Sequence, residues 1–528
     1  MHRRDFLGST SVGLATLAAP RLAQAQSSRV LRYVPHADLT GLDPVHTTAL
    51  VTLIHGLLVF DTLYGRDAEG RLQPQMVEGH VVEQDGLRWT LTLREGLRFH
   101  DGEPVRGRDV VASLRRWVAR DGFGAALMDA VEDLAAPTDR TIVFRLSRPF
   151  PLLPEALGKS GSYLPAIMPE RLAGTDPSKQ ITEMVGSGPF RFLPAERLVG
   201  SRVVYERFAG YVPRQARSSF LAGAKVAHFD RIEWRILPDP ATAAAALQAN
   251  EVDWAESVLS DIAPVLRRRR NLAVGYAEDA TLAVMRFNHL HPPFDNPAIR
   301  RALLGAVDQR AFMEASAGTD PEAWRDRVGA FARGTPMASE IGLDVLTSPR
   351  DLDRVRTDIK AAGYRGERVV VLNAADFPVI DAMTQVGADM LRRAGLNVDV
   401  QSLDWGSLVQ RRAKREPVDQ GGWSVFCTGL TGTSIDDPVG HLGLRGNGTE
   451  TGSWFGWPTA PRLEDLRRDW LATADFDRRR EICGEIQAQV WRDVPFLPLG
   501  QFLRLTAHRR DLQGVSPTIP LFFNLKLA

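Results

Sequence analysis

The sequence is poor in cysteine, because its 528 residues include only Cys427 and Cys483. Paired Cys-x-x-Cys sites, which hold structural zinc, and the dense disulfide frameworks of small secreted domains are therefore excluded. The two thiols can either form one disulfide in an oxidising compartment or stay apart as buried thiols. The sequence leaves both alternatives open.

An excess of charge of either sign is also missing. The 65 lysines and arginines nearly balance the 64 aspartates and glutamates, which gives a formal net charge of +1. Proteins whose main partner is nucleic acid are usually basic, so this balance argues against such a partner. We expect a monomer that binds no nucleic acid.

Catalytic and metal-binding motifs are missing as well. The eleven histidines are scattered, and the chain contains neither His-Glu-x-x-His nor Gly-x-Ser-x-Gly. We therefore expect a protein that is not an enzyme and that holds no cofactor and no resident metal.

Long hydrophobic runs are absent, and the apolar run near the N-terminus is too short to span a bilayer. Residues 3–7 read RRDFL, and Ala23-Gln24-Ala25 follows the apolar run, which resembles a twin-arginine export signal cleaved after Ala25. The alternative is an N-terminal helix of the mature fold. Since no cysteine stands at the cleavage site to carry a lipid, we expect a free periplasmic protein.

The segment 89–117 is the most informative part of the chain, and its hydrophobic period changes midway. Apolar residues alternate with polar ones over 89–93, which predicts a strand with one buried face. Apolar residues recur at helical spacing over 110–118, with Asp109 placed in the first turn. A strand, two turns and an amphipathic helix are predicted in this order.

This segment closely resembles the signature of the family-five extracellular solute-binding proteins, the peptide- and nickel-type receptors of ABC importers. It reads Trp-x-Leu-x-Leu-Arg-x-Gly-Leu-x-Phe-His-Asp-Gly-x-Pro, followed by Asp-Val-Val-x-Ser-Leu. Residues 239–254, 286–303 and 494–498 resemble further elements of the family. The resemblance implies an α/β, two-lobe periplasmic-binding-protein fold with an additional subdomain in the first lobe.

The resemblance also implies a division of the chain, since more than 500 residues exceed one ordinary core. The expected parts are the export signal 1–25, first lobe 26–64, additional subdomain 65–185, first lobe 186–280, second lobe 281–493 and a return to the first lobe over 494–528.

Local patterns predict several elements within these parts. A strand over 368–372, a helix over 377–394 and a strand over 397–403 form one βαβ unit. Asn296 and Pro297 are typical of a helix N-terminus. Asn250 stands where the family has a turn glycine, and asparagine tolerates the left-handed conformation that such a turn needs.

Candidate ligand-binding residues come from two regions. The resemblance implies that the loop containing Thr40 and Gly41 borders the ligand cleft in the first lobe. Trp405, Trp423 and Trp454 stand next to Gly, Asp or Ser residues, which favours aromatic surfaces on loops. The alternative is that most of these tryptophans fill a core.

The expected partner of a peptide amino group is displaced. In peptide receptors of the family, an aspartate stands three residues after the second of these tryptophans, whereas this chain has Phe426 there. Ser434 occupies the corresponding place four residues before Pro438. Asp436 is the replacement that we expect, because a desolvated ammonium needs a carboxylate.

These observations predict a substrate-binding component of an ABC importer, which captures a peptide or peptide-like solute and delivers it to a membrane permease. A receptor for a non-peptide solute or a metal chelate is the alternative, given the nickel receptors of the family and the positions of His289, His291 and His441. A periplasmic hydrolase is a third alternative.

Overall fold

The computed structural model describes residues 29–528 apart from positions 279, 336, 348, 433, 434, 436, 451 and 474. The expected export signal and Asp436 lie outside the described residues. No helix in the described part of the chain is both long and apolar enough to cross a membrane.

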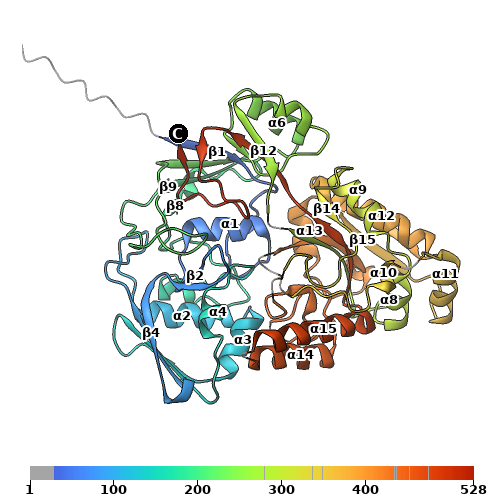
Figure 1. Ribbon diagram of the computed structural model, residues 1–528, viewed down its shortest axis with the longest axis horizontal. Helices are drawn as coiled ribbons and strands as arrows, with labels where there is room; N and C mark the ends of the chain where they lie inside the picture. The colour runs from blue at the N-terminus through green and yellow to red at the C-terminus, as the bar shows by residue number, and fades with distance from the viewer. Residues whose placement is uncertain are drawn as a thin grey trace, which may run out of the picture.

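The first large sheet has seven strands and lies at the upper left of Figure 1. Its central strand β1 pairs in parallel with β10 and β11, and the other pairings are antiparallel. In spatial order the strands are β12 (Leu272–Tyr276), β19 (Leu505–Arg509), β11 (Trp254–Ala255), β1 (Val30–Val34), β10 (Arg231–Arg235), β9 (Arg202–Arg207) and β8 (Phe190–Phe192).

The second large sheet has six strands and lies on the right of Figure 1. All seven residues of its strand β13 are buried, which places this strand at the centre of the core. In spatial order the strands are β14 (Trp324–Arg325), β18 (Phe496–Phe502), β13 (Thr281–Phe287), β17 (Val425–Thr431), β15 (Arg368–Ala374) and β16 (Asn397–Leu403).

A smaller antiparallel sheet lies at the lower left of Figure 1, next to helices α2 and α3. Its strands in spatial order are β4 (Val77–Glu83), β5 (Arg88–Leu93), β7 (Thr141–Leu146) and β6 (Val131–Ala135). The remaining strands of the described residues form two two-stranded sheets: β2 (Tyr64–Arg66) with β3 (Leu72–Pro74), and β20 (Leu512–Gln513) with β21 (Lys526–Leu527).

The longer helices cover these sheets. On the side of the first sheet they are α1 (Leu50–Val59), α2 (Gly107–Val118), α3 (Gly122–Asp129) and α6 (Pro240–Gln248). On the side of the second sheet they are α8 (Pro297–Leu304), α9 (Gln309–Ala317), α11 (Leu352–Ala361), α12 (Pro378–Arg393), α13 (Trp405–Arg411), α14 (Pro461–Ala472) and α15 (Phe476–Asp493). Four short helices are α4 (Leu153–Leu157), α5 (Glu170–Ala173), α7 (Ala263–Arg267) and α10 (Asp344–Thr347).

Two segments join the two large sheets. The chain leaves the first sheet after β12 and enters the second at β13, so residues 277–280 form one connection. It leaves the second sheet after β18 and re-enters the first at β19, so residues 503–504 form the other. We call residues 29–276 and 505–528 the first lobe and residues 281–502 the second lobe.

Several predicted elements are confirmed. The strand and helix of segment 89–117 are β5 and α2, and the buried residues of β5 alternate with partly exposed ones as expected. The βαβ unit is present, because β15 and β16 pair in parallel on either side of α12. The Asn296 side chain caps α8. Asn250 has a φ of 59°, the left-handed conformation predicted for its turn.

The return of the chain to the first lobe was expected at residue 494, and the structure corrects this. The apolar stretch that starts there forms β18, which lies between β14 and β13 in the second sheet. A buried strand reads the same in either sheet, because its apolar pattern does not specify its neighbours. The passage falls at residues 503–504 instead.

Both cysteines are free and buried, Cys427 on β17 and Cys483 on α15. The structure thus agrees with two separate thiols rather than with one disulfide. Burial raises the pKa of each thiol to about 12, so both are protonated and unreactive at neutral pH.

Candidate functional site

A cavity of about 440 Å³ lies between the two lobes, beside the two connecting segments. The first lobe and the connection at 503–504 contribute His36, Thr48, Ser162, Ser257, Asp261 and Arg504 to its wall. The second lobe contributes Phe377, Ile380, Trp405, Arg412, Thr428 and Trp454. Pockets of this size, with apolar walls and a few polar groups, are typical of small-molecule sites.

Aromatic rings form the second-lobe wall in two layers. Trp405 opens α13, directly after the N-cap residue Asp404, and its ring meets Phe377 edge-on with ring centroids 5.3 Å apart. Trp454 lines the cavity farther along. Behind it, the ring of Phe426 lies 6.0 Å from Trp454 and 5.0 Å from Trp423. The front layer can contact a solute, and the rear layer holds the rings of the front layer in place.

Arg412 brings a positive charge into this aromatic wall. It follows the last residue of α13, and only 3% of it is exposed. Its guanidinium carbon lies 4.7 Å from the ring centroid of Phe455 and 5.7 Å from that of Trp405. Its Nη2 donates a hydrogen bond to the Thr48 hydroxyl of the first lobe, at 3.2 Å. This contact joins the two lobes across the cavity.

A buried carboxylate organises the first-lobe wall. Glu256 accepts hydrogen bonds from the Tyr33 hydroxyl and from the backbone and ring of His36, and it forms an ion pair with Arg504 at 3.1 Å. Burial alone would raise the pKa of Glu256, but its interactions with His36, Arg504 and Tyr33 outweigh this effect and lower the pKa to about 2. Glu256 therefore stays ionised and fixes the positions of His36 and Arg504.

A buried ion-pair cluster joins the two lobes. Asp121 of the first lobe caps α3 and pairs with Lys159 at 2.6 Å and with Arg445 of the second lobe at 3.4 Å. The Arg445 side chain also donates to the carbonyl of Gly452. In Figure 1, α14 and α15 of the second lobe lie next to α3.

The predicted site residues fall into three groups. Trp405 and Trp454 line the cavity, whereas Trp423 and Phe426 are fully buried in the layer behind it. Thr40 and Gly41 are not part of the wall. The Thr40 methyl group instead packs against the start of α13, where a Cβ at Gly406 would lie 2.7 Å from it. Ligand contact by these residues stays a prediction.

Sequence reasoning missed Arg412, Phe377 and Thr48. Arg412 belongs to a basic run over 411–415 that is typical of a solvated helix end. Its position between Trp405 and Trp423 was the one signal that could have singled it out.

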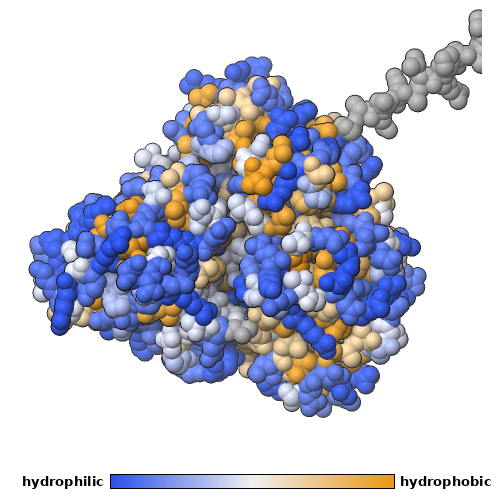
Figure 2. All heavy atoms as spheres, turned by 180° about the vertical axis from the view of Figure 1, so that it is seen from behind, coloured by the Kyte–Doolittle hydropathy of each residue, from blue (hydrophilic) through white to orange (hydrophobic). Residues whose placement is uncertain are grey.

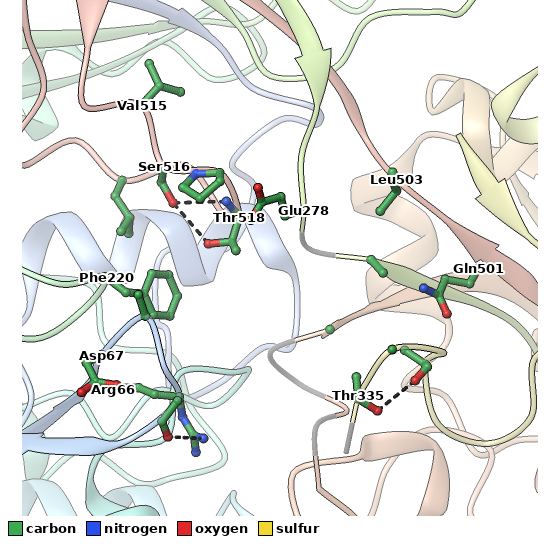
Figure 3. A pocket seen from close by; sticks show the side chains of 18 of the residues that line it. Arg66, Asp67, Phe220, Glu278, Thr335, Gln501, Leu503, Val515, Ser516 and Thr518 are labelled. Carbon is green, nitrogen blue, oxygen red and sulfur yellow. Dashed lines mark hydrogen bonds between the residues drawn. The ribbon is translucent and has the colours of Figure 1, made fainter. Parts of the chain in front are cut away.

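A larger and more open cleft of about 850 Å³ also lies between the lobes. Figure 3 shows Arg66, Asp67, Phe220 and Ser516 on its first-lobe side, opposite Thr335 and Gln501. Leu503 lines both this cleft and the smaller cavity. None of the predicted ligand-binding residues that the structure describes lines the larger cleft, so the smaller cavity is the candidate site.

The histidines considered for metal binding are engaged elsewhere. The Nε2 atoms of His289, His291 and His441 each hydrogen-bond to a backbone carbonyl oxygen. Among the described residues, no group of three His, Cys, Asp or Glu side chains is placed to hold a metal ion.

Two lobes that are joined by two segments and enclose a cavity define the architecture of a two-lobe periplasmic binding protein. The chain belongs to the bacterial extracellular solute-binding proteins, family 5, whose middle-region model matches residues 71–451. It is a solute-binding protein, and its membership was correctly inferred from segment 89–117.

Relatives cover the chain from end to end. The probable peptide ABC transporter periplasmic-binding protein y4tO of Sinorhizobium fredii is 35% identical, over 100% of both chains. The glutathione-binding protein GsiB of Pectobacterium atrosepticum is 25% identical, over 97% of this chain and 95% of that one.

Solved structures agree in fold at low identity. The periplasmic binding protein AgaA of A. tumefacien R10, in complex with agropinic acid, has a TM-score of 0.79 at 19% identity. It covers 94% of this chain and 99% of its own. The dipeptide-binding protein of Pseudoalteromonas sp. SM9913, in complex with Met-Leu, has a TM-score of 0.76 at 19% identity, over 95% and 100% of the two chains.

Proposed function

We propose that this protein is the periplasmic substrate-binding component of an ABC importer. It captures a peptide or peptide-like solute in the cavity between its lobes and delivers it to a membrane permease. It acts as a monomer, binds no nucleic acid and catalyses no reaction.

The cavity between the lobes is the observation that carries this proposal. Its walls come from both lobes and from the connection at residues 503–504, so a bound solute touches both lobes at once. A solute that contacts both lobes binds the closed conformation more tightly than the open one. The difference between the two binding free energies is the amount by which the solute stabilises the closed conformation. Closure is the signal that a permease can recognise.

Peptide capture is supported by the relatives. The full-length relative at 35% identity is named for peptide transport, and GsiB is named for glutathione, itself a small peptide-like molecule. The volume of about 440 Å³ is in the range of about 300–1,000 Å³ that is usual for small ligands.

A non-peptide solute is the second candidate, and Phe426 favours it. This residue stands where family peptide receptors have the aspartate that pairs with the peptide amino group, and it is fully buried between Trp423 and Trp454. Phe426 therefore cannot supply the carboxylate that pairs with an ammonium group. A peptide needs another carboxylate, for which Asp436 and the exposed Asp261 and Glu314 of the cavity wall are the candidates.

Export by the twin-arginine route, with cleavage after Ala25 and no lipid anchor, completes the proposal. It is supported by the arginine pair at residues 3–4 and by the absence of cysteine at the cleavage site.

Native mass spectrometry of gently purified mature protein tests the function. Solute that co-purifies is released under denaturing conditions and identified. Short peptides are the expected result, and one non-peptide species would replace peptide transport by transport of that solute class.

A second test titrates peptides into ligand-free protein and monitors binding by tryptophan fluorescence. We expect peptides to change the emission, because Trp405 and Trp454 line the cavity. Enzymatic turnover of the bound solute, or binding that leaves the emission of both tryptophans unchanged, would contradict the proposal.

A further inference from the structure

The described part of the chain buries six arginine side chains. Five of them donate to a carboxylate or to two or more backbone carbonyl oxygens: Arg116, Arg286, Arg300, Arg445 and Arg467. The sixth is Arg412. Among the described residues, the one side chain that accepts a hydrogen bond from its guanidinium is Thr48.

Aromatic rings surround the rest of the Arg412 guanidinium. The rings of Trp405, Phe426 and Phe455 surround its guanidinium, at 4.7 to 5.8 Å from the guanidinium carbon. Its Nε is buried without a hydrogen-bond partner. Aromatic faces stabilise a cation, but they do not accept the in-plane N–H groups of a guanidinium.

A buried cation in this state is costly unless an anion joins it. Burial lowers the pKa of Arg412 to about 10, so the group is still protonated at neutral pH. Arg412 lines the cavity, and an anion that enters the cavity can therefore reach it.

The other ionisable side chains of the cavity wall are either already paired or exposed to solvent. Arg504 and His36 already pair with Glu256. Asp261 and Glu314 are exposed acids of the wall, and they disfavour a solute with two or more negative charges. One planar guanidinium without a cationic neighbour matches one carboxylate better than a phosphate dianion.

We propose that Arg412 is the specificity-determining residue of the cavity and binds a carboxylate of the solute. The inference rests on the proposed function, since it takes the cavity as the solute site. The carboxylate accepts hydrogen bonds from the planar guanidinium of Arg412, while the hydrogen bond from Arg412 to Thr48 links the site to the first lobe. The carboxylate can be that of a peptide C-terminus or of another organic acid.

The test compares a pool of dipeptides with the same pool as C-terminal amides. Both are titrated into ligand-free protein prepared by unfolding and refolding, and the dissociation constants are measured by calorimetry. We expect the acids to bind about 10- to 100-fold more tightly than the amides, which is the usual contribution of hydrogen bonds to a charged group.

Three variants locate the effect. Arg412→Gln should bind acids and amides alike, and Arg412→Lys should recover only part of the preference, because a lysine lacks the planar fork. Arg415→Gln is the matched control. Arg415 is exposed, lies three residues farther along and stacks on Trp457 at 5.4 Å, outside the cavity. This control should keep the full preference.

The outcomes separate the two proposals. Equal binding of acids and amides by the unchanged protein would overturn the role of Arg412 and leave peptide capture standing. Binding of neither pool would remove peptide capture, and sodium formate then tests Arg412 alone. The melting temperature in sodium formate is compared with that in the same concentration of sodium chloride. A higher value in formate for the unchanged protein and the Arg415→Gln variant, but not for Arg412→Gln, supports the carboxylate site. No such rise would overturn it.

Discussion

Trp405 and Trp423 have the same side chain but occupy different environments. Trp405 faces the cavity, with its ring against Phe377. Trp423 is fully buried, and its indole N–H donates to the backbone carbonyls of Arg412 and Lys414. The first is therefore placed to act on a solute and the second on the fold.

Substitution of each tryptophan by phenylalanine should separate these roles. Trp423→Phe loses the indole hydrogen bonds and leaves the buried carbonyl oxygen of Arg412 without this donor, so we expect the free energy of unfolding to fall by about 1–3 kcal/mol. Trp405→Phe should change it by less than about 1 kcal/mol while weakening solute binding several-fold, since part of the contact surface is lost. Urea denaturation and calorimetry measure the two quantities.

The reverse pattern would show that the solute contacts the rear aromatic layer. In that case Trp423→Phe would weaken binding more than it lowers stability. The Trp457→Phe variant is a useful reference, because Trp457 is buried next to Trp423 and does not line the cavity.

At the scale of elements, regular patterns were predictable and contacts between lobes were not. The strand–helix order of segment 89–117 and the unit β15–α12–β16 follow from the spacing of their apolar residues, which alternate in a strand and recur every three to four residues in a helix. The aromatic character of the cavity wall was also predictable, through Trp405 and Trp454. Which member of the basic run 411–415 is buried depends on the opposite lobe, and no local pattern carries that information.

The contact between α3 and the loop that carries Arg445 is an element-scale feature with a measurable effect. Replacement of Arg445 by methionine removes the ion pair between the lobes, while Asp121 keeps Lys159. Breaking a buried pair usually costs about 3–5 kcal/mol, and the remaining pair places the expected loss at about 3 kcal/mol or less.

This substitution should also open the ligand-free protein. We expect a larger radius of gyration in small-angle X-ray scattering and weaker solute binding, because closure loses one of its contacts. Arg468→Met, which removes an exposed ion pair with Asp465, is the control and should change neither quantity. An unchanged radius of gyration in Arg445→Met would mean that this contact does not hold the lobes together.

The face of the molecule that Figure 2 shows is mostly hydrophilic and is hollowed where the lobes meet. Neutral histidines lie buried inside the molecule. Burial, with a smaller effect of Arg197, lowers the pKa of His55 to about 3, and burial lowers that of His441 to about 3 despite its hydrogen bond to Ala330. Both values lie below the 6.5 of an unfolded chain, so the unfolded state takes up protons first as the pH falls.

Stability should therefore decrease with acidification. Above about pH 6.5 neither histidine has an effect, and from there down to about pH 3 each should lower the free energy of unfolding by about 1.4 kcal/mol per pH unit. Urea denaturation at pH 7, 6 and 5 measures this slope. His441→Gln, which can keep the hydrogen bond to the Ala330 carbonyl, should show a smaller slope than the unchanged protein, and an equal slope would contradict the assignment.

The position of β19 has a consequence for the order in which the protein can assemble. This strand lies between β12 and β11 in the first sheet, yet every strand of the second sheet precedes it in the chain. While the ribosome is still synthesising the second lobe, the first sheet lacks an inner strand and cannot be finished. The smaller sheet β4–β7, built from one continuous segment, has no such delay. The first lobe is thus completed only after translation has passed β19, and a chain exported before that point would have to finish folding on the far side of the membrane.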